Sequence, residues 1–418
     1  GPRNLKNNYR PVSLTSQIVK LLERLILDEV LGHLSRNNII SCDQHGFQKN
    51  CSCVTNLLES LSDWIDLTDA KNSVDIIYLD YAKAFDSVPH KRLLYKLEHY
   101  GIRGKIKQWI ETFLKGRRQK VVLRNGTSSW KNVTSGVPQG SILGPILFLL
   151  FVNDLPKKAV STAKLFADDT KIYGTANNQT ECDTIQRDLN KSSAWSKQWL
   201  SNFNALECTV LRLRESFHYI YTLHGKELPT VEKQRDLGVL FNNTLKPGAH
   251  IIDITNKANQ KIGMIRRCFS DLTKNKVQTL YTSIVRPTLE YAAPVWSPWL
   301  KKDIDLLEKT QNRCLKLAKD DIPLESLESR RRKTDLVETF KYQTGQYKTP
   351  KERLFSYPNR ELRGHSMKLA KKQVVTDPAK YFFSNRVVET WNSLPQDVLD
   401  SRGHKNFKQK LRSLPIVQ

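Results

Sequence analysis

The sequence lacks the features that would place it in a membrane or secreted class. Across its 418 residues, no apolar run approaches the roughly 20 residues that a transmembrane helix needs. No basic, strongly amphipathic helix stands out, and no secretory signal is visible at the start. We therefore expect an intracellular protein, nuclear or cytoplasmic, that does not engage a membrane.

Cysteine is scarce and scattered. The chain has seven cysteines, an odd number, and the close pair Cys51 and Cys53 has a spacing that does not suit a zinc knuckle. The pattern predicts reduced thiols rather than a disulfide framework. Internal repeats and long low-complexity linkers are also missing from the sequence, so we expect ordinary globular domains.

What the chain has in excess is positive charge. It carries 67 Lys and Arg against 42 Asp and Glu, a formal net charge of +25. Such an excess favours a polyanionic partner, most often nucleic acid. Hydrophobic residues make up 39% of the sequence, which predicts a globular protein, and the length allows more than one domain.

Hydrophobic periodicity predicts a mixed α+β architecture. After Pro247 the pattern becomes helical and basic. Helices are expected at 15–35, 53–67, 89–101, 106–113, 181–200, 251–268, 275–290 and 302–317. Strands are expected at 74–79, 209–213, 219–223 and 237–241, with hairpins at 121–133 and around 165–173.

The segment Phe166-Ala167-Asp168-Asp169-Thr170 places two adjacent carboxylates between short apolar stretches. As a β-hairpin it would hold both acids at the tight turn. Like charges this close are costly unless a cation neutralises them, which is the situation in a two-metal phosphoryl-transfer site. The alternative is a pair of solvated turn residues, because Asp is common in turns.

Asp80 supplies a third acid. It ends the apolar stretch 74–79, where a lone carboxylate is costly without a partner, and it precedes Asp168 by 88 positions (168 − 80). The intervening elements can bring it beside the acidic hairpin. Three carboxylates on adjacent strands can hold two Mg²⁺ ions. The alternative is a turn former at a strand end.

An ordered set of short motifs runs through the chain. The motifs are, in order, 8–14 (NYRPVSL), 44–47 (QHGF), 80–86 (DYAKAFD), 135–141 (SGVPQGS), 166–169 (FADD), 237–239 (LGV), 286–291 (RPTLEY), 295–298 (VWSP), 391–395 (WNSLP) and 407–408 (FK). Together they resemble the reverse transcriptase of a non-LTR, LINE-type retrotransposon of the jockey-like and chicken-repeat-like group.

This resemblance implies a right-hand polymerase. Residues 1–245 would form the fingers, truncated at the amino end, and a palm with an antiparallel sheet; 246–320 would form a helical thumb and 321–418 a basic carboxyl-terminal region. The implied reaction is RNA-directed DNA synthesis from dNTPs on an RNA template, with a DNA primer or target DNA. Such enzymes are usually preceded by an endonuclease domain, which we expect to be missing from this chain.

The resemblance also implies roles for individual residues. The metal ligands for two Mg²⁺ ions, or Mn²⁺ in their place, would be Asp80, Asp168, Asp169 and the backbone carbonyl of Tyr81. Phe85 would be the steric gate that selects dNTPs, its alternative being a core aromatic. Nucleotide and template contacts would come from Gly136, Pro138, Gln139 and Gly140, and from Arg10 and Lys49. Leu237 and Gly238 would belong to the primer grip. The alternatives are an ordinary Gly/Pro turn and solvated surface cations.

Two positions depart from the family pattern. Glu207 stands where similar proteins carry a Lys that can protonate the leaving pyrophosphate, and an ionised Glu would repel that group. Gln48 replaces a basic residue. A catalytically weakened or dead nucleic-acid-binding relic is therefore one alternative, and an RNA-dependent RNA polymerase is another, against which Phe85 and Ala167 argue.

The basic carboxyl-terminal half carries two further expectations. The helices after Pro247 and the run Arg330–Lys333 are candidates for phosphate contacts along a duplex, with a solubilising charged face as the alternative for the run. Trp296, Trp299 and Trp391 are expected to be buried structural residues rather than base-stacking ones.

Overall fold

The computed structural model describes residues 9, 12–124, 126–318, 320–359 and 364–414. These form two compact units. The first comprises Gly1–Gln48, Asp75–Val210 and Phe217–Thr230, and the second comprises Lys49–Val74, Leu211–Ser216 and Val231–Gln418. Among the described residues, no helix is both long enough and apolar enough to cross a membrane.

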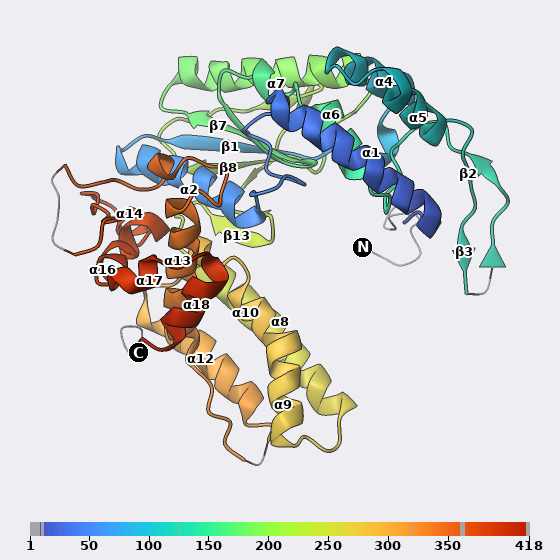
Figure 1. Cartoon of the computed structure of the whole chain (residues 1–418). Coiled ribbons are helices and arrows are strands. Elements are labelled where there is room, and N and C mark those ends of the chain that lie inside the picture. The colour runs from blue at the N-terminus through green and yellow to red at the C-terminus, as the bar shows by residue number, and fades with distance from the viewer. Residues whose placement is uncertain (1–8, 10–11, 125, 319, 360–363, 415–418) are drawn as a thin grey trace. The chain divides into compact units, whose positions relative to one another are not determined.

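A five-stranded sheet of order β11–β8–β1–β7–β6 is the main sheet of the fold (Figure 1). The strands are β1 (Val74–Leu79), β6 (Thr162–Phe166), β7 (Asp169–Thr175), β8 (Thr209–Leu213) and β11 (Thr230–Val231). β1 is central and every one of its residues, Asp75 included, is buried, as expected for a mainly apolar strand covered on both faces. The predicted α+β class is confirmed.

The helices of the first unit form its core against this sheet. They are α1 (Gln17–Arg36), α3 (Ala84–Ser87), α4 (His90–His99), α5 (Gly104–Leu114), α6 (Gly144–Val152) and α7 (Gln179–Trp199). α6 is apolar on all sides and is buried over its length except at Pro145, while the amphipathic α7 packs on β7. Short strands complete the unit: β2 (Arg118–Gln119), β3 (Val122–Leu123), β4 (Gly126–Thr127), β5 (Lys131–Asn132), β9 (Thr222–Leu223) and β10 (Lys226–Glu227).

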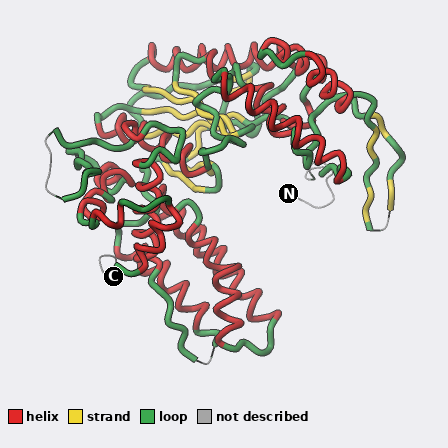
Figure 2. Tube along the Cα trace, in the orientation of Figure 1, coloured by secondary structure: helices red, strands yellow, loops and turns green. Residues whose placement is uncertain are grey.

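The second unit is mostly helical, as Figure 2 shows by colour. Its longer elements are α2 (Cys53–Asp69), β12 (Lys233–Asp236), β13 (Val239–Asn242), α8 (Gly248–Cys268), α9 (Lys274–Leu280), the π-helix η3 (Tyr281–Val285), α10 (Arg286–Glu290), α11 (Ala293–Trp296), α12 (Lys301–Leu315) and α13 (Leu327–Gln343). Short helices follow: α14 (Asp377–Lys380), α15 (Phe383–Arg386), α16 (Val388–Asn392), α17 (Gln396–Leu399) and α18 (His404–Arg412). α8 packs on α12, α10 and β13.

Several expectations can be compared with this architecture. Trp296 and Trp391 are buried, each donating its indole N–H to a backbone carbonyl, so their structural role is confirmed. All seven cysteines are free thiols. The predicted strand 237–241 was wrong at its start: β13 begins at Val239, and Leu237 and Gly238 make the turn after β12 with φ of +43° and +89°.

Candidate active site

The acidic hairpin is formed by β6 and β7, which pair antiparallel with Phe166 opposite Asp169. This register leaves Ala167 and Asp168 as a two-residue loop, and Ala167 takes a φ of +58°. The predicted hairpin is confirmed, and the two acids take different positions at its turn. Asp168 lies in the turn, whereas Asp169 is the first residue of β7 and is exposed. Because successive strand residues face opposite sides, the register decides where each acid points.

Gln44 holds this turn from outside the hairpin. Its buried side-chain oxygen accepts hydrogen bonds from the backbone N–H groups of Ala167 and Gly46, each at 2.8 Å. The flanking backbone pairs with β6, since His45 N donates to the Leu165 carbonyl at 2.9 Å. A Cβ on Gly46 would lie 2.4 Å from the Ala167 nitrogen, so this close approach requires glycine. The strained Ala167 conformation is thus supported by a buried polar contact.

Asp80 follows β1 and is half-buried. The segment containing Asn204 and Glu207 lies alongside it: Asn204 N donates to the Asp80 carbonyl at 2.8 Å, and Tyr81 forms an antiparallel bridge with Phe203. The Asp80 backbone N–H in turn points at the Cys208 sulfur, 3.3 Å away. This arrangement brings Glu207 next to Asp80.

The electrostatics of Asp80 reveal how acidic its surroundings are. Burial, then the neighbouring Glu207 carboxyl, then the charges of Asp168 and Asp169 raise the pKa of Asp80 to about 7. Asp80 therefore interacts with all three of the other acids. The predicted grouping of Asp80 with Asp168 and Asp169 is visible in these interactions, and Glu207 adds a fourth carboxyl to it. Such a group gains most from a bound cation.

The donors suit a hard divalent cation, which prefers carboxylate oxygens. As they stand, however, the described residues contain no group of three or more His, Cys, Asp or Glu side chains placed to hold a metal ion. The donor chemistry fits Mg²⁺ or Mn²⁺, whereas the side chains do not converge on one point. The Tyr81 ring is buried against Phe203, with ring centroids 4.6 Å apart. The role of the Tyr81 carbonyl stays a prediction.

Phe85 lies on α3, four residues beyond Tyr81. Its ring stacks on Phe148 of α6 at 4.7 Å between centroids and meets Phe47 edge-on at 6.4 Å. Phe85 is half-buried and packs against the core of this unit. The stacked contact fixes the position of the ring, as a steric gate requires. Its role in selecting the sugar stays a prediction.

The glycine-rich loop before α6 is joined to the segment around Phe85. Val137 N donates to the Phe85 carbonyl at 2.8 Å, and the Gln139 side chain donates to the Asp86 carboxylate at 3.1 Å. A Cβ on Gly136, which has a φ of +90°, would lie 2.8 Å from the Asp86 backbone. Gly136 is therefore required for this contact. Pro138 is buried beside it. A Cβ on Gly140, which has a φ of +103°, would lie 2.8 Å from the Ser13 carbonyl oxygen.

Glu23 of α1 anchors the other end of this loop. Its fully buried carboxylate accepts from Ile142 N at 2.7 Å and from Leu143 N at 3.0 Å, just before α6 begins. A carboxylate at a helix N-terminus is favoured by the helix dipole and by the unpaired backbone N–H groups there. Sequence reasoning did not single out Glu23. No local pattern distinguishes it from the exposed acids of an amphipathic helix.

The other four predicted site residues lie outside the described part of the first unit. Arg10 lies outside the described residues. Lys49, Leu237 and Gly238 belong to the second unit, where Lys49 is exposed. In that unit Tyr291 packs against Gly238 and donates its hydroxyl to the Leu237 carbonyl at 2.9 Å. Their roles as nucleotide and primer contacts stay predictions.

Comparison with known proteins decides the family. The family described as "Reverse transcriptase (RNA-dependent DNA polymerase)" matches residues 2–222, which is more than half of the chain. This chain belongs to that family. The resemblance predicted from the ordered motifs is confirmed, and with it the right-hand polymerase class to which reverse transcriptases belong.

Similar proteins from Drosophila carry related names. The "Probable RNA-directed DNA polymerase from transposon BS" of Drosophila melanogaster is 26% identical over 76% of this chain and 37% of its own length. The corresponding protein of transposon X-element, from the same species, is 28% identical over 76% of this chain and 36% of its own. The "RNA-directed DNA polymerase from mobile element jockey" of Drosophila funebris is 27% identical, covering 74% and 35%. This chain thus spans little more than a third of these relatives.

Solved structures give weaker likenesses. Telomerase from Candida tropicalis, in complex with a fragment of telomeric RNA, is 12% identical with a TM-score of 0.39, covering 71% of this chain and 53% of that one. The apo form is 13% identical with a TM-score of 0.40, covering 71% and 49%. A likeness at this level adds nothing further to the description of this chain.

Proposed function

We propose that this chain carries the RNA-directed DNA polymerase activity of a non-LTR retrotransposon, extending a DNA primer from dNTPs on an RNA template. The observation that carries the proposal is the electrostatic grouping of Asp80, Asp168 and Asp169 at the ends of the neighbouring strands β1 and β7. Acids at these positions of a reverse transcriptase are the expected ligands of a divalent-metal nucleotidyl-transfer site.

In the proposed reaction, Asp80, Asp168, Asp169 and the Tyr81 carbonyl would hold two Mg²⁺ ions, or Mn²⁺. Bound there, the ions would activate the primer 3′-hydroxyl and neutralise charge on the departing pyrophosphate. The chain's own residues position these acids: Gln44 fixes the turn that carries Asp168. They also shape the nucleotide site through Phe85 and the loop Gly136–Gly140, where small residues permit close backbone approach.

The same resemblance supports proposed roles for the other parts of the chain. Residues 1–245 would serve as fingers and palm, 246–320 as the thumb that follows the duplex, and 321–418 as a basic appendage. Lys49 and Arg10 would contact the triphosphate or template, and Leu237 and Gly238 the primer. The net charge of +25 supports a nucleic-acid partner.

One observation favours a second candidate, a nucleic-acid-binding relic with little or no activity. Glu207 adds a negative charge where the leaving pyrophosphate would need a proton donor, and it lies against Asp80. Repulsion between Glu207 and the pyrophosphate would slow turnover without affecting how the chain binds a template.

The first prediction tests the proposal directly. The purified chain is given a primed RNA template with Mg²⁺ and either dNTPs or rNTPs. Extension is expected with dNTPs, and Asp168→Asn should lower its rate by at least about 10³-fold because a charged ligand is lost. Glu98→Gln is the matched control, since it removes an exposed carboxylate that pairs with Lys107 in the same unit. If the wild type binds the duplex but does not extend the primer, the chain is a nucleic-acid-binding relic. If Asp168→Asn extends the primer as fast as the wild type does, the assignment of Asp168 as a metal ligand is rejected.

The second prediction concerns Glu207. Glu207→Lys should raise the single-turnover rate by on the order of 10-fold or more, because it replaces a repelling carboxylate with a proton donor. Glu207→Gln removes the charge without supplying the proton, so an intermediate rate is expected. Rapid-quench measurement of one nucleotide addition checks both variants. Equal rates in all three proteins would show that this position does not limit turnover.

A further inference from the structure

A two-stranded hairpin between α5 and α6 carries an unusual concentration of positive charge. Its strands pair Arg118 opposite Asn132 and Val122 opposite Thr127. From Thr112 to Asn153 the sequence contains no Asp or Glu. The cations of this basic hairpin (residues 117–133) are Arg117, Arg118, Lys120, Arg124 and Lys131.

These cations are not neutralised locally. Arg118, Lys120, Arg124 and Lys131 are exposed, and within the part of the chain that the structure describes none of them forms an ion pair. The neighbouring ion pairs lie before the hairpin: Lys107 of α5 pairs with Glu98 of α4, and Lys115, directly after α5, pairs with Glu111. The basic hairpin therefore presents an uncompensated positive surface, and such a surface attracts phosphate groups.

The basic hairpin also exposes an aromatic side chain. Trp130 is 56% exposed, and the Lys120 ammonium and Arg118 guanidinium lie 5.1 and 5.7 Å from its ring centre. Arg118 begins β2 and Lys120 directly follows it, and both cations lie over the indole, so they share a face of the ribbon with Trp130. An aromatic ring flanked by cations is the arrangement on which unpaired bases stack while their phosphates meet the charges.

The rest of the basic hairpin does not bury itself in the protein. Val122 and Leu123 are 65% and 70% exposed, and Figure 1 shows β2 and β3 extending away from the end of α5. An isolated two-stranded ribbon is marginal in water, because it has no third strand or helix to cover its face. Its exposed apolar and cationic side chains gain from a partner that offers both stacking surface and negative charge.

We propose that the basic hairpin 117–133 is a binding arm for single-stranded nucleic acid, in which Trp130 stacks on an unpaired base and Arg118, Lys120, Arg124 and Lys131 contact phosphates. This site lies outside the acidic group and does not depend on whether that group catalyses polymerisation. A single strand is favoured over a duplex because stacking on an indole requires an unpaired base.

Fluorescence anisotropy of the full chain with a labelled 12-nucleotide single strand tests the arm, in EDTA and without dNTPs so that polymerisation plays no part. The combined variant R118Q/K120Q/R124Q/K131Q should weaken binding by about 10- to 100-fold and reduce the slope of log K against log salt by about 2 to 3, since each lost phosphate contact removes about 0.7. Trp130→Ala should weaken binding by about 5- to 100-fold, and Trp130→Phe should restore most of it.

The matched control removes the same charge from cations that have acidic partners. R332Q/K333Q/K371Q/K372Q eliminates four cations that pair with Glu328, Glu325, Glu389 and Asp66. The control should bind as the wild type does. Equal losses in the two combined variants would show an effect of total charge and would overturn the proposal, as would unchanged binding by the hairpin variants.

Three further measurements identify the partner. RNA and DNA strands of the same sequence show which sugar is preferred, and a preference for either one supports the proposed role of the basic hairpin. A blunt duplex of the same length should bind more weakly than the single strand. Vesicles containing anionic lipid test the competing surface: loss of vesicle binding in Trp130→Ala, with strand binding intact, would overturn the proposal. Thermal melting of each variant checks that it is folded, and the hairpin variants, which change exposed positions, should melt as the wild type does.

Discussion

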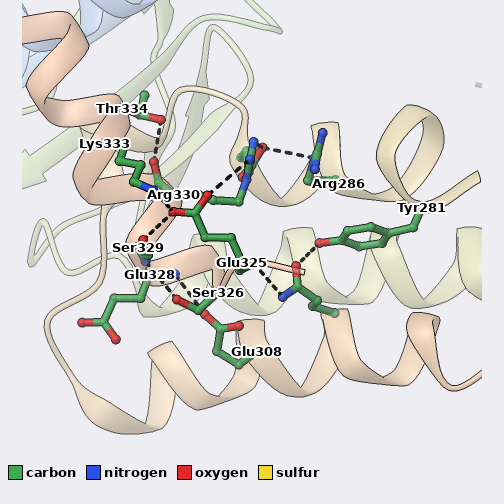
Figure 3. Close-up of polar contacts among 12 residues, drawn as sticks. Tyr281, Arg286, Glu308, Glu325, Ser326, Glu328, Ser329, Arg330, Lys333 and Thr334 are labelled. Atoms are coloured by element: carbon green, nitrogen blue, oxygen red, sulfur yellow. Dashed lines mark hydrogen bonds and ion pairs between the residues drawn. The ribbon is translucent and has the colours of Figure 1, made fainter. Parts of the chain in front are cut away.

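The basic hairpin and helix α13 both carry a run of cations, and the surroundings of those cations differ. In α13, Arg330 binds Glu290 through two nitrogens, Lys333 pairs with Glu325 at 2.6 Å, and Arg332 pairs with Glu328 at 2.7 Å. Figure 3 shows Arg330 and Lys333 pointing toward Glu325. In the basic hairpin the cations are exposed and the surrounding sequence has no acid.

This difference separates a structural use of charge from a binding use. The sequence alone left the run Arg330–Lys333 open between phosphate contact and a charged surface. In the structure Arg331 is 3% exposed, and Arg330, Arg332 and Lys333 are paired with acids of the protein itself. The positive charge of this run is therefore balanced within the fold. A count of Lys and Arg therefore overstates the surface available to nucleic acid.

The largest effect is expected where an ion pair of α13 is broken. Arg330→Gln should lower the free energy of unfolding by about 2 kcal/mol, because the half-buried Glu290 carboxylate loses charged hydrogen bonds. Arg124→Gln in the basic hairpin should change it by less than about 0.5 kcal/mol. Urea denaturation measures both. If the two variants had the same free energy of unfolding, the ion pair of Arg330 would not stabilise the fold, and the proposed difference between α13 and the basic hairpin would be rejected.

A smaller effect is expected when the basic hairpin is made to resemble α13. Asn132 lies directly opposite Arg118, so Asn132→Glu supplies the acidic partner that the basic hairpin lacks. The cross-strand pair should stabilise the ribbon by about 0.2–1 kcal/mol and weaken single-strand binding by about 3- to 10-fold, as Arg118 exchanges a phosphate for a carboxylate. Asn132→Gln is the control, and anisotropy is the measurement. Tighter binding by the Glu variant would exclude Arg118 as a phosphate contact.

Much of the fold could be predicted from local pattern. The strand 74–79 was predicted with its correct bounds because its apolar residues, interrupted only by Asp75, suit a strand that is buried on both faces. The helix predicted at 53–67 was observed at Cys53–Asp69, since Ser52 caps its first turn. The error at Leu237 has a physical reason as well. An apolar residue at a tight turn looks like the start of the strand it precedes.

For the candidate site, the motifs led to a prediction of which residues belong together, whereas the contacts around those residues could not be predicted. The grouping of Asp80 with Asp168 followed from motifs, but the contact between Asp80 and Glu207 depends on residues 202–204 pairing with residues 80–82. The support of Ala167 by Gln44 likewise joins residues 123 positions apart. No periodicity carries such information, because both contacts arise from tertiary pairing of irregular segments.

The smallest effect is expected from a change of pH, which should lower the stability of α13 but not that of the basic hairpin. Burial raises the pKa of Glu325, but hydrogen bonds from Lys333 and Ser329 and the charges of Lys333 and Arg330 outweigh it, so that pKa is lowered in the folded chain. A carboxyl with a lowered folded pKa stabilises the fold above its ordinary value near 4.3, and that stability is lost as pH falls through the folded pKa. The loss should stay below about 1 kcal/mol because the pair is partly exposed.

Hydrogen exchange, corrected for intrinsic rates, should show weaker protection in α13 below pH 4.3 and no such change in the basic hairpin, which has no carboxyl to titrate. Glu325→Gln should remove its share of the pH dependence in α13, and an unchanged profile would assign that dependence to other acids.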